Sequence, residues 1–389
     1  MATKETITER DIDVVDVIDA DAEAAAVLEE LTHGKDVVAE PLWKIRLRLF
    51  RRSFVKNWGL FTESKLGLVG LAIIILFGLM AVAHPILMST VWDPAIYDPV
   101  SGYDAVVTEY TVVEDDAVTD PVTQIGITEA RFDLNPTIDV GDVVRIPAQP
   151  APPTLGGEEG NAHFLGTDPQ GRDVFSQLLY GARAAFLLGF VAAFTTVFIA
   201  TTVGAIAAYY GGKLDGFLMR TADLILLMPL LPLLIVLSAA IQINMIMLGI
   251  MIGILGGFGG DAIILKSQAL SIKVKSYIDA ARVAGGGDRH IIFRHIVPNV
   301  VPLSLLYMMF GVTTAIALEA TLSFLGLLNV QMSWGIMINT ASTQGYLLGI
   351  TSYWWLLFPA GLAVTFLAFG FFVVGRGMDE VINPRLRAR

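Results

Sequence analysis

Long apolar runs alternate with polar segments along most of the chain, and six of these runs reach the length of a membrane span. A helix needs about 20 mainly apolar residues to cross the hydrocarbon core of a bilayer. The expected spans are residues 66–87, 184–209, 217–240, 243–265, 299–322 and 352–375. The pattern therefore predicts an all-α polytopic membrane protein with six transmembrane helices.

Lysine and arginine are unevenly distributed between the segments that join these spans. They gather at residues 44–65, 213–220, 266–294 and 376–389, whereas residues 326–351 contain none. Cytoplasmic segments carry an excess of both residue types. We therefore expect a multi-pass protein of the cell membrane with both termini in the cytoplasm.

The composition agrees with a membrane protein and excludes other classes. Of the 389 residues, 54% are hydrophobic and 16% are charged, whereas soluble proteins contain about 25% charged residues. A net charge of −11 argues against nucleic-acid binding. The absence of cysteine excludes disulfides, thiolate metal sites and cysteine nucleophiles, and the five scattered histidines give no reason to expect a metal site. Acid-rich exposed regions with few lysines suggest a prokaryote that lives in high salt.

The N-terminal region has two different compositions before the first span begins. Residues 1–40 are acidic and predict a disordered cytoplasmic tail. Residues 41–65 are basic and aromatic, which is typical of an amphipathic helix at the membrane interface. Residues 66–89 then form the first transmembrane segment.

A long connection separates the first two spans. Residues 90–162 contain short runs rich in Val, Thr and Ile between Asp, Asn, Pro and Gly, which predicts a small β-rich extracytoplasmic insertion. Its role is left open between a contact surface or cover over a pore mouth and a variable decoration. Residues 163–389 form the transmembrane core, with a cytoplasmic coupling loop at 266–298.

The segment that leads into the second span, residues 163–183, reads HFLGTDPQGRDVFSQLLYGAR. Its glycines permit sharp turns, and its charged residues can form charge-assisted hydrogen bonds. These residues are Gly166, Gly171 and Gly181, with Asp168, Arg172 and Asp173. We favour a structural entry hairpin over a role in substrate contact.

The polar stretch 276–298 lies between two expected spans and predicts a helix-turn-helix on the membrane surface. Ser276 and Asp279 form a capping-box pattern, and the following helix presents small alanines. Those alanines are Ala280, Ala281 and Ala284. Gly285 should end this helix, Asp288 should cap a second one, and Pro298 should stop it. The alternative is an ordinary amphipathic cytoplasmic loop.

Two further features concern the inside of the membrane. Glu319 is expected within the fifth span, where a carboxylate is costly, so it should line the pore or form a pair near a dimer axis. Gly256, Gly257, Gly259 and Gly260 lack the Lys-Ser/Thr of a phosphate loop, and we attribute them to close helix packing.

Both polar segments resemble known motifs. Residues 276–298 are similar to the EAA loop of ABC-transporter permeases, with Asp for the usual Glu and His at a position where the peptide and nickel branch also has it. The matching residues are Asp279, Ala280, Ala281, Gly285, His295, Val297 and Pro298. Residues 163–183 resemble the entry block of the second-permease type in the dipeptide, oligopeptide and nickel family, although Phe164 and Gln177 depart from it. The matching residues are His163, Gly166, Thr167, Asp168, Gly171, Arg172, Asp173, Tyr180, Gly181 and Arg183.

This resemblance implies a type I ABC importer permease, not an enzyme. It implies a pore shared with a second homologous permease, two ATPase subunits that hold ATP and Mg, an extracytoplasmic solute-binding protein, and no cofactor in this chain. Dipeptides or oligopeptides are the expected cargo, with nickel or another small solute as the alternative. A standalone secondary transporter is a competing class, and a purely structural membrane protein is a third.

Overall fold

The computed structural model describes residues 51, 55, 58–104, 107–111, 118–119, 126–127, 143–147, 150–156 and 161–382. The expected acidic tail, most of the interfacial helix and most of the insertion lie outside these residues. The chain divides into two compact units, Met1–Leu60 and Phe61–Arg389. The description below concerns the second unit.

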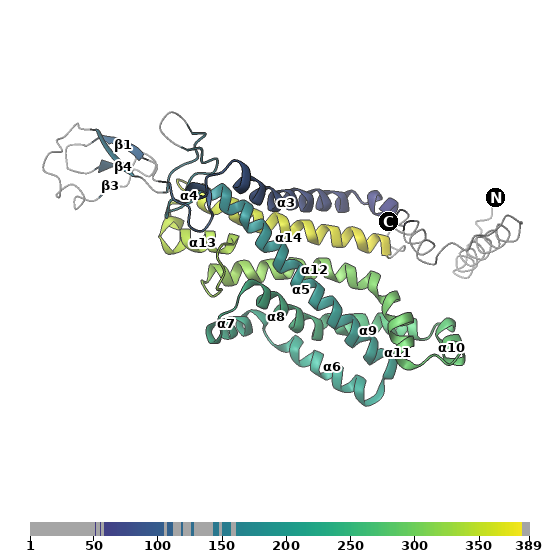
Figure 1. Cartoon of the computed structure of the whole chain (residues 1–389). Coiled ribbons are helices and arrows are strands. Elements are labelled where there is room, and N and C mark those ends of the chain that lie inside the picture. Colours follow the sequence, from purple (N-terminus) through teal and green to yellow (C-terminus); the bar gives the residue numbers. More distant parts are fainter. Residues whose placement is uncertain are drawn as a thin grey trace, which may run out of the picture. The chain divides into compact units, whose positions relative to one another are not determined.

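Long apolar helices form the body of this unit (Figure 1). Over the described residues, four helical stretches are long and apolar enough to cross a membrane: Lys65–Thr90, Val174–Tyr210, Asp288–Phe324 and Trp354–Val381. They contain α3 (Lys65–Thr90), α5 (Val174–Tyr210), α12 (Val297–Phe324) and α14 (Trp354–Ile382). The helical class and the multi-pass character expected from the sequence are confirmed.

The other two expected spans are each broken into a bent pair of helices. Helices α6 (Gly212–Leu227) and α7 (Leu230–Ala240) meet at 83°, and α8 (Met245–Phe258) and α9 (Gly260–Lys273) meet at 47°. Pro229 explains the first break, because a proline forces the preceding residue, Met228, out of the helical conformation. The described chain thus holds four spans, or six if each bent pair is one span.

Helix α5 contacts more neighbours than any other described helix, and its tightest contact is with α8. Three glycines on α8, each four residues from the next, face α5: Gly249, Gly253 and Gly257. A Cβ on Gly249 would lie 2.9 Å from Val191 Cγ1, and one on Gly257 would lie 2.8 Å from Ile199 Cβ. The expected packing role is therefore confirmed for Gly257, whereas Gly256 has only ordinary contacts.

Helix α3 packs on α14 through a second set of glycines. A Cβ on Gly70 would lie 2.6 Å from the Gly370 carbonyl oxygen, and one on Gly377 would lie 2.8 Å from Gly67 Cα. Small residues allow helix backbones to approach closely where lipid provides no hydrophobic drive for association.

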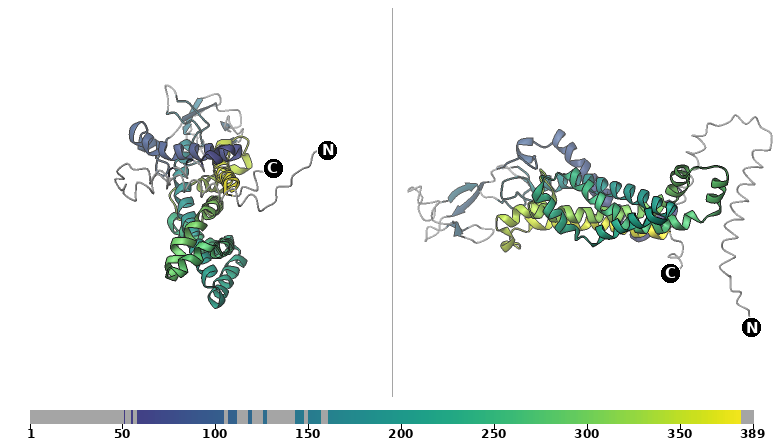
Figure 2. Two further views of the ribbon diagram at one scale, coloured as in Figure 1. Left: turned by 90° about the vertical axis from the view of Figure 1, so that its right-hand side faces the viewer. Right: turned by 90° about the horizontal axis from the view of Figure 1, so that it is seen from below.

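The coupling loop contains α10 (Ser276–Val283), α11 (Asp288–Ile291) and a π-helical turn, Ile292–Ile296, that runs directly into α12. The right-hand view of Figure 2 shows α10 and α11, in green, at one end of the long helices. The expectation that Pro298 stops the second helix was wrong. Pro298 lies inside the continuous helical stretch Asp288–Phe324 and follows the π-turn, whose wider hydrogen-bonding pattern accommodates the proline ring.

Short strands occur in the part of the insertion that the structure describes. Strand β1 (Val107–Thr111) pairs antiparallel with β4 (Val143–Pro147), and β2 (Val118–Thr119) pairs with β3 (Gly126–Ile127). The remaining elements are α4 (Pro94–Tyr97), α13 (Trp334–Thr343) and a 3₁₀ turn at Tyr346–Gly349. The β-rich character of the whole insertion stays a prediction.

The contact between α3 and α14 yields a stability test. Gly70→Ala should lower the free energy of unfolding by about 1–3 kcal/mol, because the new methyl group meets backbone that cannot yield. Thermal unfolding of the purified protein in detergent would measure the change.

Gly78→Ala in the same helix is the matched control. A Cβ there has nothing within 4 Å, and alanine favours a helix over glycine by about 1 kcal/mol. Equal stability of the two variants would contradict the packing account.

Candidate functional site

Two polar assemblies lie at opposite ends of α5. The first, here called the entry anchor, comprises residues 161–183 with the segments that contact them. The second is the coupling loop, which contacts the C-terminal end of α5. A helix of 37 residues is about 55 Å long, so α5 connects the two assemblies across the thickness of a membrane.

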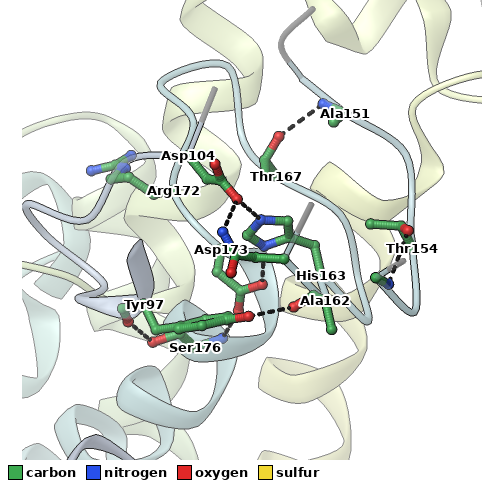
Figure 3. Close-up of polar contacts among 12 residues, drawn as sticks. Tyr97, Asp104, Ala151, Thr154, Ala162, His163, Thr167, Arg172, Asp173 and Ser176 are labelled. Atoms are coloured by element: carbon green, nitrogen blue, oxygen red, sulfur yellow. Dashed lines mark hydrogen bonds and ion pairs between the residues drawn. The ribbon is translucent and has the colours of Figure 1, made fainter. Parts of the chain in front are cut away.

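His163 is the centre of the entry anchor and is fully buried (Figure 3). Its Nδ1 lies 2.7 Å from Asp173 Oδ2, and its Nε2 lies 2.9 Å from Asp104 Oδ2. The other oxygen of Asp173 accepts the backbone N–H of Ser176, which makes this aspartate the N-cap of α5. His163 thus connects the start of α5 to Asp104, which lies 59 residues before the histidine in the chain.

The two carboxylates decide the charge of His163. Burial alone would lower the pKa of the imidazole, but the hydrogen bonds and negative charges of Asp173 and Asp104 raise it above its ordinary value. Both ring nitrogens donate to carboxylates in the protonated form, and neither is left for activating a nucleophile. The arrangement suits a structural ion cluster rather than catalysis.

The ion pair expected within this segment is confirmed. Asp168 Oδ2 accepts from Arg172 Nε at 2.7 Å, and the same oxygen accepts from Gln177 Nε2 at 2.8 Å. Gly166 and Gly171 have positive φ angles of 72° and 79°, as their expected turns require.

Thr167 and Gly181 join the anchor to distant parts of the chain. The Thr167 hydroxyl accepts the N–H of Ala151, and its carbonyl accepts from Trp355 Nε1 at 3.1 Å. The sharp turn expected at Gly181 was wrong, because this residue lies within α5. Gly181 instead leaves space for the indole of Trp334, whose Nε1 donates to the Leu178 carbonyl. The segment is therefore a junction between α5, α13 and α14.

Tyr180 and Arg183 lie on either side of Gly181, in the first turns of α5. The Arg183 guanidinium carbon is 5.8 Å from the centre of the Tyr180 ring. The Tyr180 ring also contacts His84 of α3, and the two ring centroids are 5.2 Å apart.

The coupling loop differs in detail from the expected helix-turn-helix. Lys275, not Ser276, is the N-cap of α10, and Asp279 pairs with Arg282 at 3.0 Å instead of completing a capping box. Gly287 precedes α11, so Asp288 does not cap it. The expected end of the first helix is confirmed, because Gly285 has φ +82°.

The exposed surface of α10 and its C-terminal cap combines small and larger residues. Ala280, Ala284 and Gly285 are exposed, as are Tyr277 and Val283, whereas Ala281 is half-buried and Ile278 is completely buried against the core. Ile278 and Ala281 therefore pack α10 on the transmembrane body, while Ala280 and Ala284 face outward. At the other end of the loop, His295 contacts His290 at a ring distance of 5.4 Å.

Tyr209, near the end of α5, connects that helix to the loop and was missed in the sequence. Its hydroxyl donates to Asp288 Oδ1 at 2.7 Å, and the Arg282 guanidinium carbon lies 5.5 Å from its ring centre. A tyrosine pair before two glycines was the only available signal, and it does not identify the partner 79 residues later.

Glu319 lies in the contact between α12 and α13. Its side chain is 3% exposed and accepts from the Ser323 hydroxyl at 2.6 Å. Ser333, the N-cap of α13, lies close to it, and its hydroxyl accepts the Ile336 N–H. The positive end of a helix dipole favours a carboxylate at this place. The expected roles at a pore or dimer axis stay predictions.

The described residues contain no group of three or more potential metal ligands. What the two assemblies can do is mechanical: one fixes the entry of α5, and the other presents a small-residue surface at its exit.

Comparison with known proteins gives a consistent result. Residues 200–388 match the family described as binding-protein-dependent transport system inner membrane component. The chain is 36% identical over 240 residues to the oligopeptide transport system permease protein OppC of Haemophilus influenzae, covering 61% of this chain and 74% of that relative. It is 32% identical over 234 residues to the dipeptide transport system permease protein DppC of Bacillus subtilis, covering 58% and 69%.

The raised pKa of His163 predicts a pH-dependent stability. The protonated ring stabilises the fold fully below its ordinary pKa of about 6.5, and this contribution is lost as the pH rises through the higher folded-state pKa. The unfolding temperature should therefore fall on the alkaline side, and Asp104→Asn should move that fall to lower pH. Asp93→Asn, which keeps a capping side chain on α4, is the control. An identical pH profile for Asp104→Asn would refute the ion cluster.

The hydrogen bond from Tyr209 predicts how firmly the coupling loop is held. Tyr209→Phe should destabilise residues 276–288 by up to about 1 kcal/mol, so their amide exchange should accelerate up to about fivefold. Hydrogen-exchange mass spectrometry would measure it. Tyr210→Phe, at the exposed neighbouring residue, should leave the rate unchanged; equal acceleration in both variants would contradict the assignment.

Proposed function

The chain belongs to the family of binding-protein-dependent transport system inner membrane components, and we propose that it serves an ATP-driven importer of dipeptides or oligopeptides. It is a multi-pass membrane permease subunit, since its relatives are transport permeases and not enzymes. The names of those relatives support the peptide cargo. Nickel or another small solute is the alternative cargo for the same architecture.

In this proposal the pore forms between this chain and a second homologous permease. Two cytosolic ATPase subunits bind ATP and Mg, and a solute-binding protein delivers cargo from outside. This chain carries no cofactor. The family implies ATPase and binding-protein partners in general; their number and the second permease are part of the proposal.

The proposed topology counts each bent helix pair as one span, which gives six spans. Both termini and the coupling loop lie in the cytoplasm, and residues 90–162 lie outside. The distribution of lysine and arginine supports this orientation. The length of α5 supports placing the entry anchor and the coupling loop on opposite sides of the membrane.

The observation that carries the mechanism is the geometry of α10. Exposed Ala280 and Ala284 let the backbone of a partner approach closely, while buried Ile278 and the Tyr209 contact fix the helix to the transmembrane body. ATPase closure would then move α10 as a rigid body. The uninterrupted helical path from Asp288 to Phe324 would transmit that movement into the membrane and alternate the pore between inward-open and outward-open states.

A bulky substitution on α10 tests this mechanism. Ala284→Arg and Ala281→Arg should abolish ATP-dependent uptake and release the ATPase subunits during purification. The Ala284→Arg side chain separates the end of α10 from its partner, and Ala281→Arg also disturbs the packing of α10 on the transmembrane body. Gly285→Asp should act similarly, since it adds a charge at a residue with positive φ. Uptake into membrane vesicles and co-purification are the measurements.

Gly216→Arg is the matched control, because Gly216 lies on α6, is exposed, and has nothing within 4 Å of an added Cβ. It should insert, assemble and transport as the native chain does. Normal ATP-coupled uptake by Ala284→Arg would sink the docking role, and uptake without any ATPase would indicate a secondary transporter.

A further inference from the structure

A cavity of about 480 Å³ opens beside the entry anchor. Three segments line it: the first turns of α5, the turn between α7 and α8, and the turn between α12 and α13. Its polar lining residues are Tyr180, Arg183, Asn244, Asn329 and Gln331. This volume suits a small organic solute or one end of a larger one.

Arg183 gives the cavity its charge. No other lysine, arginine, aspartate or glutamate is among the residues that line it. Arg183 lies just before the expected second span, residues 184–209, and its exposed side chain lines the cavity. A charged residue at this depth is costly unless it faces water or a partner. A carboxylate is the group that a guanidinium binds best, through two parallel hydrogen bonds.

The walls of the cavity are fixed in the structure described here. The Tyr180 hydroxyl donates a long hydrogen bond to Gln331 Oε1, at 3.4 Å, and the Asn329 N–H donates to the Ile243 carbonyl at 3.1 Å. These contacts hold the three segments together around Arg183. The Tyr180 ring lies against the guanidinium, which limits the orientations that the arginine adopts.

The amide groups complement the cation. Asn244 Oδ1 accepts the Met247 N–H at the start of α8, so its NH₂ group is the part that can donate to a ligand oxygen. The site therefore combines a planar cation with an amide donor and offers no negative charge from its lining residues.

We propose that this cavity receives the C-terminal carboxylate of a peptide as it enters the pore, with Arg183 as the residue that binds it. The inference rests on the proposed function and adds the chemical group that this chain recognises. The amides of Asn244 and Gln331 would orient the terminal residue, and the cavity would discriminate a free carboxylate from a neutral peptide end.

The test compares one short peptide with its C-terminal amide. The complete complex is reconstituted in liposomes with ATP and Mg²⁺ on the ATPase side and the binding protein on the other, and initial uptake rates give an acid-to-amide ratio. The binding protein is identical for every variant, so a change in this ratio comes from the permease. Arg183→Gln should lower the ratio by about tenfold, the loss expected for a charged hydrogen-bonded pair. Arg183→Lys keeps the charge but loses the two parallel N–H donors, so it should lower the acid-to-amide ratio less.

Arg220→Gln on α6 is the control and should leave the ratio unchanged. If both uptake rates fall together in Arg183→Gln and Arg183→Lys, or if neither changes, the inference is wrong. Loss of the second permease from both variant complexes would also overturn it, because the cavity would then be a subunit contact. ATP-dependent uptake of neither peptide by the native complex would refute the peptide cargo itself, which is a different result from an unchanged ratio.

Discussion

The close approach of backbones around α5 is the constraint on which the rest of this structure depends. Helices in lipid gain little from burying apolar side chains against each other, so they associate where small residues allow dense contact. Gly249, Gly253 and Gly257 bring α8 against α5, and Gly181 admits the Trp334 indole at the other end of the same helix. Because α5 also packs on α3, α9 and α12, its position decides where both polar assemblies lie. The entry anchor and the coupling loop are attached to the two ends of this one helix.

Much of this arrangement could be predicted from the sequence. Apolar run length predicted the helical, multi-pass character, and four of the six expected spans are single long helices, whereas the other two are bent helix pairs. The charged pair Asp168–Arg172 followed from residue type and spacing. The family resemblance also holds. The helix-end chemistry was less predictable. Ser276 and Asp279 have the residue types of a capping box, yet the chain begins α10 one residue earlier and uses Asp279 for an ion pair. A local sequence pattern predicts that a hydrogen bond can form, but whether it forms depends on the other partners that the same side chain can reach.

Contacts between residues far apart in the chain had no readable signal. Asp104 and Tyr209 are unremarkable in the sequence, and each acquires a partner only when the fold brings a distant segment close. Glu319 was expected beside a pore or in a pair near a dimer axis, because a carboxylate in a membrane needs compensation. The compensation in this chain includes Ser323 and the N-terminus of α13, which a reading along α12 alone could not identify. The helix that continues past Pro298 was also unpredictable, since the π-turn that accommodates the proline is a property of the backbone and not of any one residue.

The entry anchor also holds together the two ends of the segment that precedes it in the chain. Asp104 binds His163, and the Tyr97 hydroxyl donates to the Ala162 carbonyl, so the two ends of the intervening segment are pinned side by side. These two contacts offset the entropic cost of bringing the ends of the segment together, and that cost grows only slowly with the length of the segment. Because these contacts hold its two ends, a change in the length of the segment between them is expected to leave α3 and α5 in place.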